Sequence, residues 1–349
     1  MNTAVNLCGL SRSDFEQLME SIGKKPFQGR QLYKWIYKNN VFDFTQMTDL
    51  GKELQKFLMK KYRVRIPLEI DSRKSSDGTT KFLLGLEDNE VIESVLIPDE
   101  NSGRMTYCIS SQVGCALNCK FCATGQLEFR RNLTVGEIVG QVMFIRKIFS
   151  HDAFDNLVFM GMGEPLLNID NVLASIDILT DSLGFMLGAK RITVSTAGIV
   201  PGINKLTESG SKANLAISLN AADDNLRKRL MPIAKSYNLS DLMGAVKQWT
   251  EVRTRRVTFE YILIKNVNNG DEHAINLSKL IRGIPCKINL LAYNPIDGNK
   301  WESPASEDVD RFAKILYPRA PAVTVRQSRG GDIAAACGQL AGQKGYICE

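Results

Sequence analysis

Three cysteines that lie close together constrain this chain more than any other feature. Cys115, Cys119 and Cys122 form the pattern C-x3-C-x2-C, and Cys108 precedes them by seven residues. Thiolates this close in sequence can converge on one inorganic centre with little loss of chain entropy. The residues just before them, Met105–Ser110, are typical of a short strand, which places the cysteine loop at the C-terminal end of that strand.

The spacing separates two kinds of inorganic centre. Structural zinc sites usually take four protein ligands, commonly from C-x2-C pairs or from cysteine with histidine. Here the spacing is three-then-two, and the only histidines, His151 and His273, are not near the loop. The pattern resembles the signature of the radical S-adenosylmethionine (SAM) superfamily, in which three cysteines hold a [4Fe–4S] cluster and the remaining iron binds SAM. A zinc loop or a set of buried free thiols is the alternative.

Length and cysteine content bound the protein class. The 349 residues leave room for one large domain and one small one. No apolar run approaches the roughly 20 residues that span a bilayer, and the N-terminus does not read as a signal peptide. Eight cysteines without a secretion signal predict a reducing, cytoplasmic location.

Positive charge is concentrated at the N-terminus. Residues 1–75 contain fourteen Lys and Arg against eight Asp and Glu, so they carry the whole net charge of +6. Three helices are expected there, one capped at Ser11, one beginning after Pro26 and one over Leu50–Tyr62. The second helix places Arg30, Lys34 and Lys38 on one face. We therefore expect a basic helical unit that binds RNA phosphates. The alternative is a small helical domain whose charged face is only solvated.

The rest of the chain alternates strands and helices. Two strand-like runs between Thr79 and Pro98 predict a β-hairpin. Further strands are expected at Asn156–Met160, Arg191–Ser195, Asn214–Leu219, Val257–Ile264, Lys287–Ala292 and Ala322–Arg326. Helical segments between them include Thr134–Ile148, Asn171–Leu183 and Glu272–Arg282. This alternation predicts an α/β fold with about six βα units, an incomplete TIM-like barrel.

Polar and glycine-rich segments follow several of these strands. They are Gly161–Pro165, Ser195–Gly198, Ser218–Ala221 and Tyr293–Pro295. Active sites of barrels lie at the C-terminal ends of the strands, so these segments are expected to meet the cysteine loop there.

A further cysteine, Cys337, lies among small residues near the C-terminus. Alanines and glycines on both sides give its sulfur steric access, and Arg326 and Arg329 upstream favour a thiolate. A packed small hydrophobic residue is the alternative. Of the cysteines outside any motif, Cys286 is interpreted as a core residue, and Cys8 and Cys348 as bystanders near the termini.

Several long sequence motifs, spread over nearly the whole chain, resemble those of one protein family. CISSQVGCALNCKFCAT, FMGMGEPLLN, ITVSTAGIVP, INLLAYNP and DIAAACGQLAG are similar, in this order, to the RlmN/Cfr family of radical SAM RNA adenine methyltransferases. The N-terminal KPFQGRQLYKWIY is similar to the RlmN branch in particular.

The resemblance implies a reaction in two stages that uses two SAM molecules. The cysteine that matches Cys337 first receives a methyl group from one SAM. A second SAM is cleaved to a 5′-deoxyadenosyl radical, which activates the S-methyl group for addition to an adenine carbon. The cysteine that matches Cys108 resolves the protein–RNA adduct through a transient Cys108–Cys337 disulfide. The carboxylate that matches Glu93 accepts a proton.

The resemblance also assigns the cofactor ligands. Cys115, Cys119 and Cys122 match the ligands of the [4Fe–4S] cluster. The SAM contacts fall on Gly163, Glu164, Ser195, Ser218, Leu219, Asn220 and Asn294. The sequence departs from the family pattern at two positions. Met162 lies between the glycines of a GGEP-like motif, and Asn220 replaces the histidine that is usual in the family. Asparagine can donate and accept hydrogen bonds but cannot take a charge.

Together these features predict three units and their partners. Residues 1–75 are expected to bind RNA, residues 76–104 to form a hairpin linker, and residues 105–349 to form the radical SAM core with the catalytic cysteine segment. The implied substrate is an adenine in the peptidyl-transferase region of protein-free 23S rRNA, methylated at C2, together with the adenine 3′ of the anticodon in tRNAs. The base must be unstacked, because pairing hides C2 in the minor groove. The protein is also expected to take electrons from a donor such as flavodoxin or ferredoxin, to be a monomer and not to associate with a membrane.

Two other functions remain open from the sequence. A Cfr-type enzyme, which methylates C8 of adenine, shares almost every motif. A non-catalytic Fe–S or zinc RNA-binding protein would bind metal regardless of Cys337 and would not cleave SAM.

Overall fold

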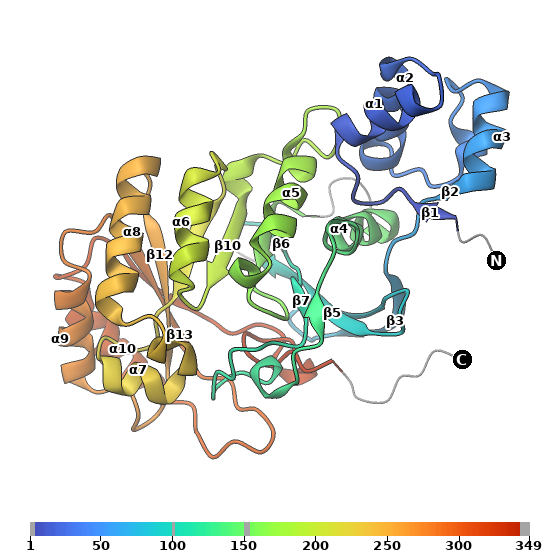
Figure 1. Cartoon of the computed structure of the whole chain (residues 1–349). Coiled ribbons are helices and arrows are strands. Elements are labelled where there is room, and N and C mark those ends of the chain that lie inside the picture. Colours follow the sequence, from blue (N-terminus) through green and yellow to red (C-terminus); the bar gives the residue numbers. More distant parts are fainter. Residues whose placement is uncertain (1–3, 100–101, 150–153, 343–349) are drawn as a thin grey trace.

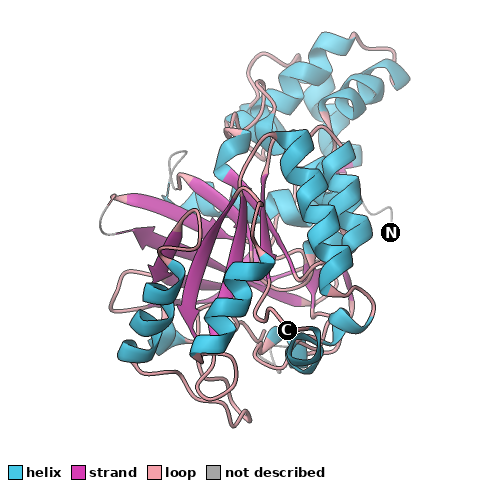
Figure 2. Ribbon diagram, turned by 90° about the vertical axis from the view of Figure 1, so that its left-hand side faces the viewer, coloured by secondary structure: helices cyan, strands magenta, loops and turns pink. Residues whose placement is uncertain are grey.

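A curved ten-stranded sheet forms the centre of the molecule, in a computed structural model that describes residues 4–99, 102–149 and 154–342 (Figures 1 and 2). The strand order is β14-β13-β12-β11-β10-β9-β6-β5-β4-β3. Seven of these strands run parallel, each beside the next one along the chain. They are β6 (Arg104–Cys108), β9 (Asn156–Phe159), β10 (Ile192–Thr196), β11 (Asn214–Ser218), β12 (Val257–Leu263), β13 (Cys286–Ala292) and β14 (Val323–Arg326).

Helices connect the parallel strands and cover the outer face of the sheet (Figure 1). They are α4 (Val135–Phe149), α5 (Ile169–Thr180), α6 (Val200–Glu208), α7 (Asp224–Leu230), α8 (Leu239–Arg253), α9 (Asp271–Leu280) and α10 (Ser306–Leu316). Sequential βα units of this kind give the partial TIM-like barrel that the alternation predicts, so the predicted fold class is confirmed. Cys286, at the start of β13, is fully buried, as expected of a core residue.

The predicted hairpin extends the sheet beyond β6. Strands β4 (Thr80–Gly85) and β5 (Val91–Asp99) pair antiparallel, and β5 pairs antiparallel with β6. A further strand, β3 (Leu68–Lys74), forms the sheet edge within the segment expected to be helical and basic. Its residues are mostly charged and exposed, as is common for edge strands, so no hydrophobic alternation marks it in the sequence.

The N-terminal helices form a separate group beside α4 (Figure 1). They are α1 (Arg12–Ser21), α2 (Pro26–Tyr33), which continues into a π-helical turn at Lys34–Lys38, and α3 (Lys52–Lys61). Ser11 and Asp14 form the predicted capping box of α1. A short parallel pair, β1 (Val5–Asn6) and β2 (Tyr62–Arg63), closes the group.

The N-terminal group packs directly on the barrel. Cys8, expected to be a bystander, is buried here, and its Sγ lies 3.3 Å from the carbonyl oxygen of Gly136 in α4. Asn40 Nδ2 donates to the carbonyl of Met143 at 3.1 Å. Cys348 and His151 lie outside the described residues. In the part of the chain that the structure describes, every helix is too short or too polar to cross a lipid bilayer.

Candidate active site

One cavity at the C-terminal ends of the parallel strands gathers most of the predicted site residues. Its lining includes the cysteine loop, the segment after β9, the ends of β10 and β11, and the C-terminal segment. Eight of the predicted residues are among the lining: Cys115, Cys119, Cys122, Gly163, Glu164, Ser195, Ser218 and Cys337. The expectation that strand ends and cysteine loop meet is therefore confirmed for Gly161–Pro165, Ser195–Gly198 and Ser218–Ala221, whereas Tyr293–Pro295 is not part of this lining.

A two-stranded stem holds the cysteine loop. Strands β7 (Gln112–Val113) and β8 (Arg131–Asn132) pair antiparallel on either side of it. Gly114 adopts a φ of +71°, and a Cβ there would collide with the carbonyl of Glu128. Glycine is needed at this position both for its left-handed backbone and for this close approach.

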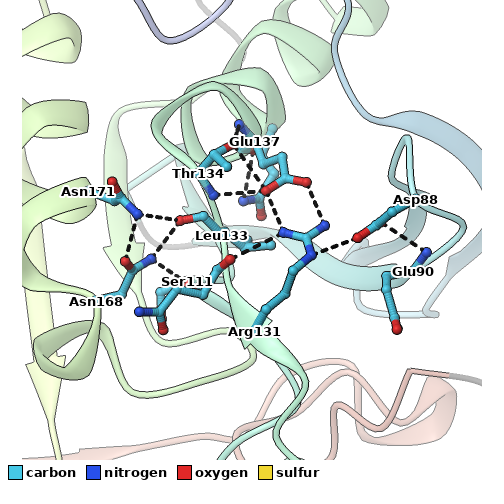
Figure 3. Close-up of polar contacts among 11 residues, drawn as sticks. Asp88, Glu90, Ser111, Arg131, Leu133, Thr134, Glu137, Asn168 and Asn171 are labelled. Carbon is cyan, nitrogen blue, oxygen red and sulfur yellow. Dashed lines mark hydrogen bonds and ion pairs between the residues drawn. The ribbon is translucent and has the colours of Figure 1, made fainter.

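Arg131 fixes the stem to two other elements (Figure 3). Its guanidinium donates to both carboxylate oxygens of Glu137 in α4, at 2.8 and 2.7 Å, and its Nε donates to Asp88 in the β4–β5 turn at 2.7 Å. The hydrogen bond from Arg131 lowers the pKa of Asp88. Bidentate charge-assisted pairs of this kind restrict orientation as well as contributing energy.

Two asparagines tie the same loop to α5 (Figure 3). Asn168 Nδ2 donates to the carbonyls of Ser111 at 2.9 Å and of Leu133 at 2.8 Å. Asn171 Nδ2 donates to Leu133 at 3.0 Å and to Asn168 Oδ1 at 2.9 Å. Both ends of the cysteine loop are thus fixed by side-chain contacts from neighbouring elements.

The three cysteines of the loop all line the same cavity. In a [4Fe–4S] cluster each thiolate binds a different iron, so three cysteines that line one cavity can hold three of the four irons. Burial raises the pKa of the Cys115 thiol to about 12 in the protein alone, so cluster binding must displace protons.

The Gly161–Pro165 segment brings its backbone close to the cysteine loop. Gly163 has a φ of +95°, and a Cβ there would collide with the side chain of Gln112. The extra residue, Met162, is buried with its sulfur 3.3 Å from the backbone nitrogen of Glu93. Met162 therefore packs towards the hairpin, and both flanking glycines still line the cavity.

Glu164 is a buried carboxylate that organises this part of the site. Its oxygens accept hydrogen bonds from the backbone nitrogens of Leu166 at 3.0 Å and Ala197 at 2.8 Å. Its own backbone nitrogen donates to Gln112 Oε1 at 2.8 Å. Burial raises the pKa of Glu164 to about 7, although these hydrogen bonds oppose the rise.

Glu260 is a cavity residue that is not among those predicted from the sequence. It lies within β12, lines the cavity, and accepts a hydrogen bond from Asn289 Nδ2 at 2.8 Å. Burial raises its pKa, and the bond from Asn289 opposes the rise. A glutamate inside an otherwise apolar strand, VTFEYIL, is the signal that would have found it.

Leu219 and Asn220 do not line the cavity in this structure. Leu219 is fully buried. Asn220 has a φ of +58°, and its Oδ1 accepts a hydrogen bond from the backbone nitrogen of Ile262 at 2.9 Å. The Asn220 carbonyl accepts another from Asn268 at 2.8 Å. The amide side chain thus holds the turn after β11 against β12, and asparagine tolerates this backbone better than most residues.

Cys337 lies between this cavity and a second one that it shares with Cys108. Asn294, predicted to contact SAM, lies beside Cys337 in the structure, and its Nδ2 donates to the Cys337 carbonyl at 3.2 Å. Desolvation by surrounding protein atoms raises the pKa of the Cys337 thiol, with a contribution from Glu260 that Arg326 opposes. The side chain keeps a solvent-exposed edge. Cys108 is buried, and burial raises its pKa.

Glu93 stands apart from both cavities. Its carboxylate pairs with Lys81 at 3.1 Å and accepts a hydrogen bond from the backbone nitrogen of Ala341 at 2.9 Å. It points to the same face of β5 as Val95, which lines the second cavity with Cys108 and Cys337. The carboxylate therefore contacts the C-terminal segment rather than the Cys337 thiol itself.

Comparisons with known proteins agree with this geometry. Residues 5–64 match the ribosomal RNA large subunit methyltransferase N-terminal domain, and residues 109–278 match the radical SAM superfamily. A crystal structure of a radical SAM methyltransferase from Sphaerobacter thermophilus is 38% identical, over 97% of this chain and 100% of that one, with a TM-score of 0.91. A crystal structure of Streptococcus suis SuiB is 17% identical, over 64% of this chain and 49% of that one, with a TM-score of 0.47.

The fold and the site define a radical SAM enzyme, whose cofactors are a [4Fe–4S] cluster and SAM. The chain belongs to the RlmN/Cfr family of radical SAM methyltransferases.

Proposed function

We propose that this enzyme methylates C2 of an adenine in the peptidyl-transferase region of 23S rRNA. The observation that carries the proposal is the position of Cys337, which lines the cavity of the cluster cysteines on one side and that of Cys108 on the other. A sulfur at this junction is well placed to receive a methyl group on one side and to deliver it on the other. The N-terminal domain match supports ribosomal RNA as the substrate.

The protein's own residues have distinct roles in this proposal. Cys115, Cys119 and Cys122, which line the cavity, would hold the cluster, and the cluster would supply the electron that cleaves SAM. SAM would lie against Gly163, Glu164, Ser195 and Ser218, which line the cavity. The family resemblance alone adds Leu219, Asn220 and Asn294 as further SAM contacts. Polar backbone and hydroxyl groups of this kind orient the cofactor without reacting.

Cys337 is the methyl carrier. Its thiolate would attack the methyl carbon of one SAM and displace S-adenosylhomocysteine, and the second SAM of the turnover would activate the resulting S-methyl group by removal of a hydrogen atom. Bonding of the carbon radical to adenine leaves one unpaired electron, which the oxidised cluster would take back, and Glu93 accepts the proton from the ring carbon. The Cys108 thiolate then attacks the Cys337 sulfur and breaks its bond to the methylene carbon, which takes up a proton as the methylated base leaves. A Cys108–Cys337 disulfide remains for reduction. Both cysteines are free thiols in the structure.

The proposal also assigns roles to the N-terminal residues, to the linker and to the reaction partners. Residues 1–75 grip RNA, since they carry the net charge and expose Arg30, Lys34 and Lys38. Residues 76–104 link this unit to the core of residues 105–349. The enzyme acts as a cytoplasmic monomer on protein-free rRNA, with tRNA as a second substrate and a flavodoxin or ferredoxin as reductant.

Mass spectrometry of digested RNA tests the proposal. The cluster-reconstituted protein is incubated anaerobically with SAM, reductant and an unmodified 23S rRNA fragment. We expect 2-methyladenosine, and we expect none from Cys337→Ala, because that variant lacks the methyl carrier. An 8-methyladenosine peak would show a Cfr-type enzyme instead. No product, while a control enzyme works in the same tube, would contradict methyl transfer to rRNA.

A further inference from the structure

A buried ion pair in the hairpin contacts the segment that carries Cys337. Lys81 Nζ on β4 lies 3.1 Å from Glu93 Oε1 on β5, and the two side chains are only 11% and 3% exposed. A buried pair of charges is costly to desolvate unless further polar groups satisfy it. The partners that satisfy this pair come from the C-terminal segment.

Each member of the pair holds one end of the segment 334–341. Lys81 Nζ donates to the carbonyl of Ala334 at 3.1 Å. The backbone nitrogen of Ala341 donates to Glu93 Oε2 at 2.9 Å. Cys337 lies between these two attachment points, so the ion pair closes the segment into a loop at its base.

The other charged groups nearby do not make these contacts. Asp71 and Arg73 of β3 line the same small cleft as Lys81 and Glu93. They pair with each other, with Arg73 Nε 3.5 Å from Asp71 Oδ2. Lys81 therefore provides the positive charge that links Glu93 to the Ala334 carbonyl.

We propose that Lys81 is a positioning residue for methyl transfer. Together with Glu93 it fixes both ends of the segment 334–341 and thereby holds Cys337 between the two cavities. The role of Lys81 in methyl transfer rests on the proposed function, whereas the contacts that attach the segment 334–341 to Lys81 and Glu93 do not. Each carboxylate oxygen of Glu93 has one partner here, Lys81 on one and the Ala341 nitrogen on the other.

Amide hydrogen exchange on the full-length, cluster-loaded protein tests the attachment without SAM or RNA. In Lys81→Met, peptides that cover 334–342 should exchange at least about tenfold faster, because a hydrogen bond from a charged group is lost. Peptides from β9 to β13 should keep their wild-type rates. Lys81→Arg should recover most of the protection, since it keeps the charge and the donors. The matched control is Arg73→Met, which removes a neighbouring cation that does not contact the segment and should exchange like wild type.

A kinetic measurement tests the positioning role. Single-turnover S-methylation of Cys337, followed by peptide mass, should slow about tenfold in Lys81→Met, while the SAM concentration for half-maximal rate stays unchanged. If Lys81→Met fails to fold, the double variant Lys81→Met/Glu93→Gln leaves no unpaired buried charge and should show the same local acceleration.

Three outcomes would overturn the proposal: unchanged exchange over 334–342, acceleration throughout the barrel, or a wild-type S-methylation rate. Failure of the proposed function gives a different result. In that case the local exchange effect and its rescue by Lys81→Arg remain, and no methylated RNA forms.

Discussion

The cysteine loop and the Cys337 segment reach the same cavity but are held in different ways. The cysteine loop rises from a paired stem, β7 and β8, and Arg131 and two asparagines fix its base (Figure 3). The Cys337 segment, residues 330–341, has little regular structure and is held by single polar contacts from distant parts of the chain. One of these joins Ser75 to Asp332, which are 257 residues apart in sequence.

The difference matches the two tasks that the proposed reaction sets. A cluster and its SAM need fixed geometry, because electron transfer and bond cleavage depend on a stable position. A methyl carrier must instead meet SAM, then the base, then Cys108. Separate polar contacts can be released one at a time, whereas a paired stem opens only as a unit.

The largest effect should come from removing a cluster ligand. Cys119→Ala is expected to lose the iron and the visible absorption of the Fe–S cluster, because two thiolates are left to hold it. RNA methylation should fall below detection. Cys337→Ala is the matched control: it should keep full iron content and still give no product. Iron retained by Cys119→Ala would show that this cysteine is not a ligand.

Local sequence signals were enough to predict the fold and most of the cavity. The cysteine spacing, the glycine-rich segment after β9 and the strand–helix alternation each depend on neighbouring residues. Parallel strands then bring their C-terminal ends together without further information. The capping box at Ser11 and the hairpin of β4 and β5 were predictable for the same reason.

Features that depend on distant contacts were not predictable. β3 is a charged edge strand recognisable only by its pairing with β4. Asn220 matches a SAM-binding position in the family, yet its side chain bonds to Ile262, and no local pattern indicates that contact. Lys81 looks like an ordinary strand lysine until the fold places the Ala334 carbonyl beside it.

A moderate effect is expected from weakening the base of the cysteine loop. Arg131→Gln removes the bidentate contact with Glu137 and the contact with Asp88. Because the Arg131 side chain is 30% exposed, we expect a loss of about 2 kcal/mol in the free energy of unfolding. Denaturant unfolding of both proteins measures it.

Arg130→Gln provides the matched control, since its side chain is 59% exposed and pairs only loosely with Glu128, at 3.7 Å. It should leave stability within about 0.5 kcal/mol of wild type. Equal losses of unfolding free energy in the two variants would show that the Arg131 contacts do not fix the cysteine loop.

The smallest effect should appear in the attachment of the Cys337 segment at acid pH. Asp77 Oδ2 accepts a hydrogen bond from the backbone nitrogen of Gly330 at 2.8 Å. Burial alone would raise the pKa of Asp77, but the bonds from Gly330 and Thr79 outweigh it and lower the pKa to about 2. A carboxylate with a lowered folded-state pKa stabilises the fold above its unfolded pKa, and this contribution is lost as the pH falls towards 2.

Asp77→Asn removes this titration while keeping an acceptor oxygen. After discounting for solvent screening of a partly exposed group, wild type should lose about 1 kcal/mol more than the variant between pH 4 and pH 2. Denaturant unfolding at both pH values measures the difference. Parallel losses in the two proteins would show that Asp77 does not couple the segment to pH. A larger loss in wild type would instead show that the Cys337 segment has an acid-sensitive attachment.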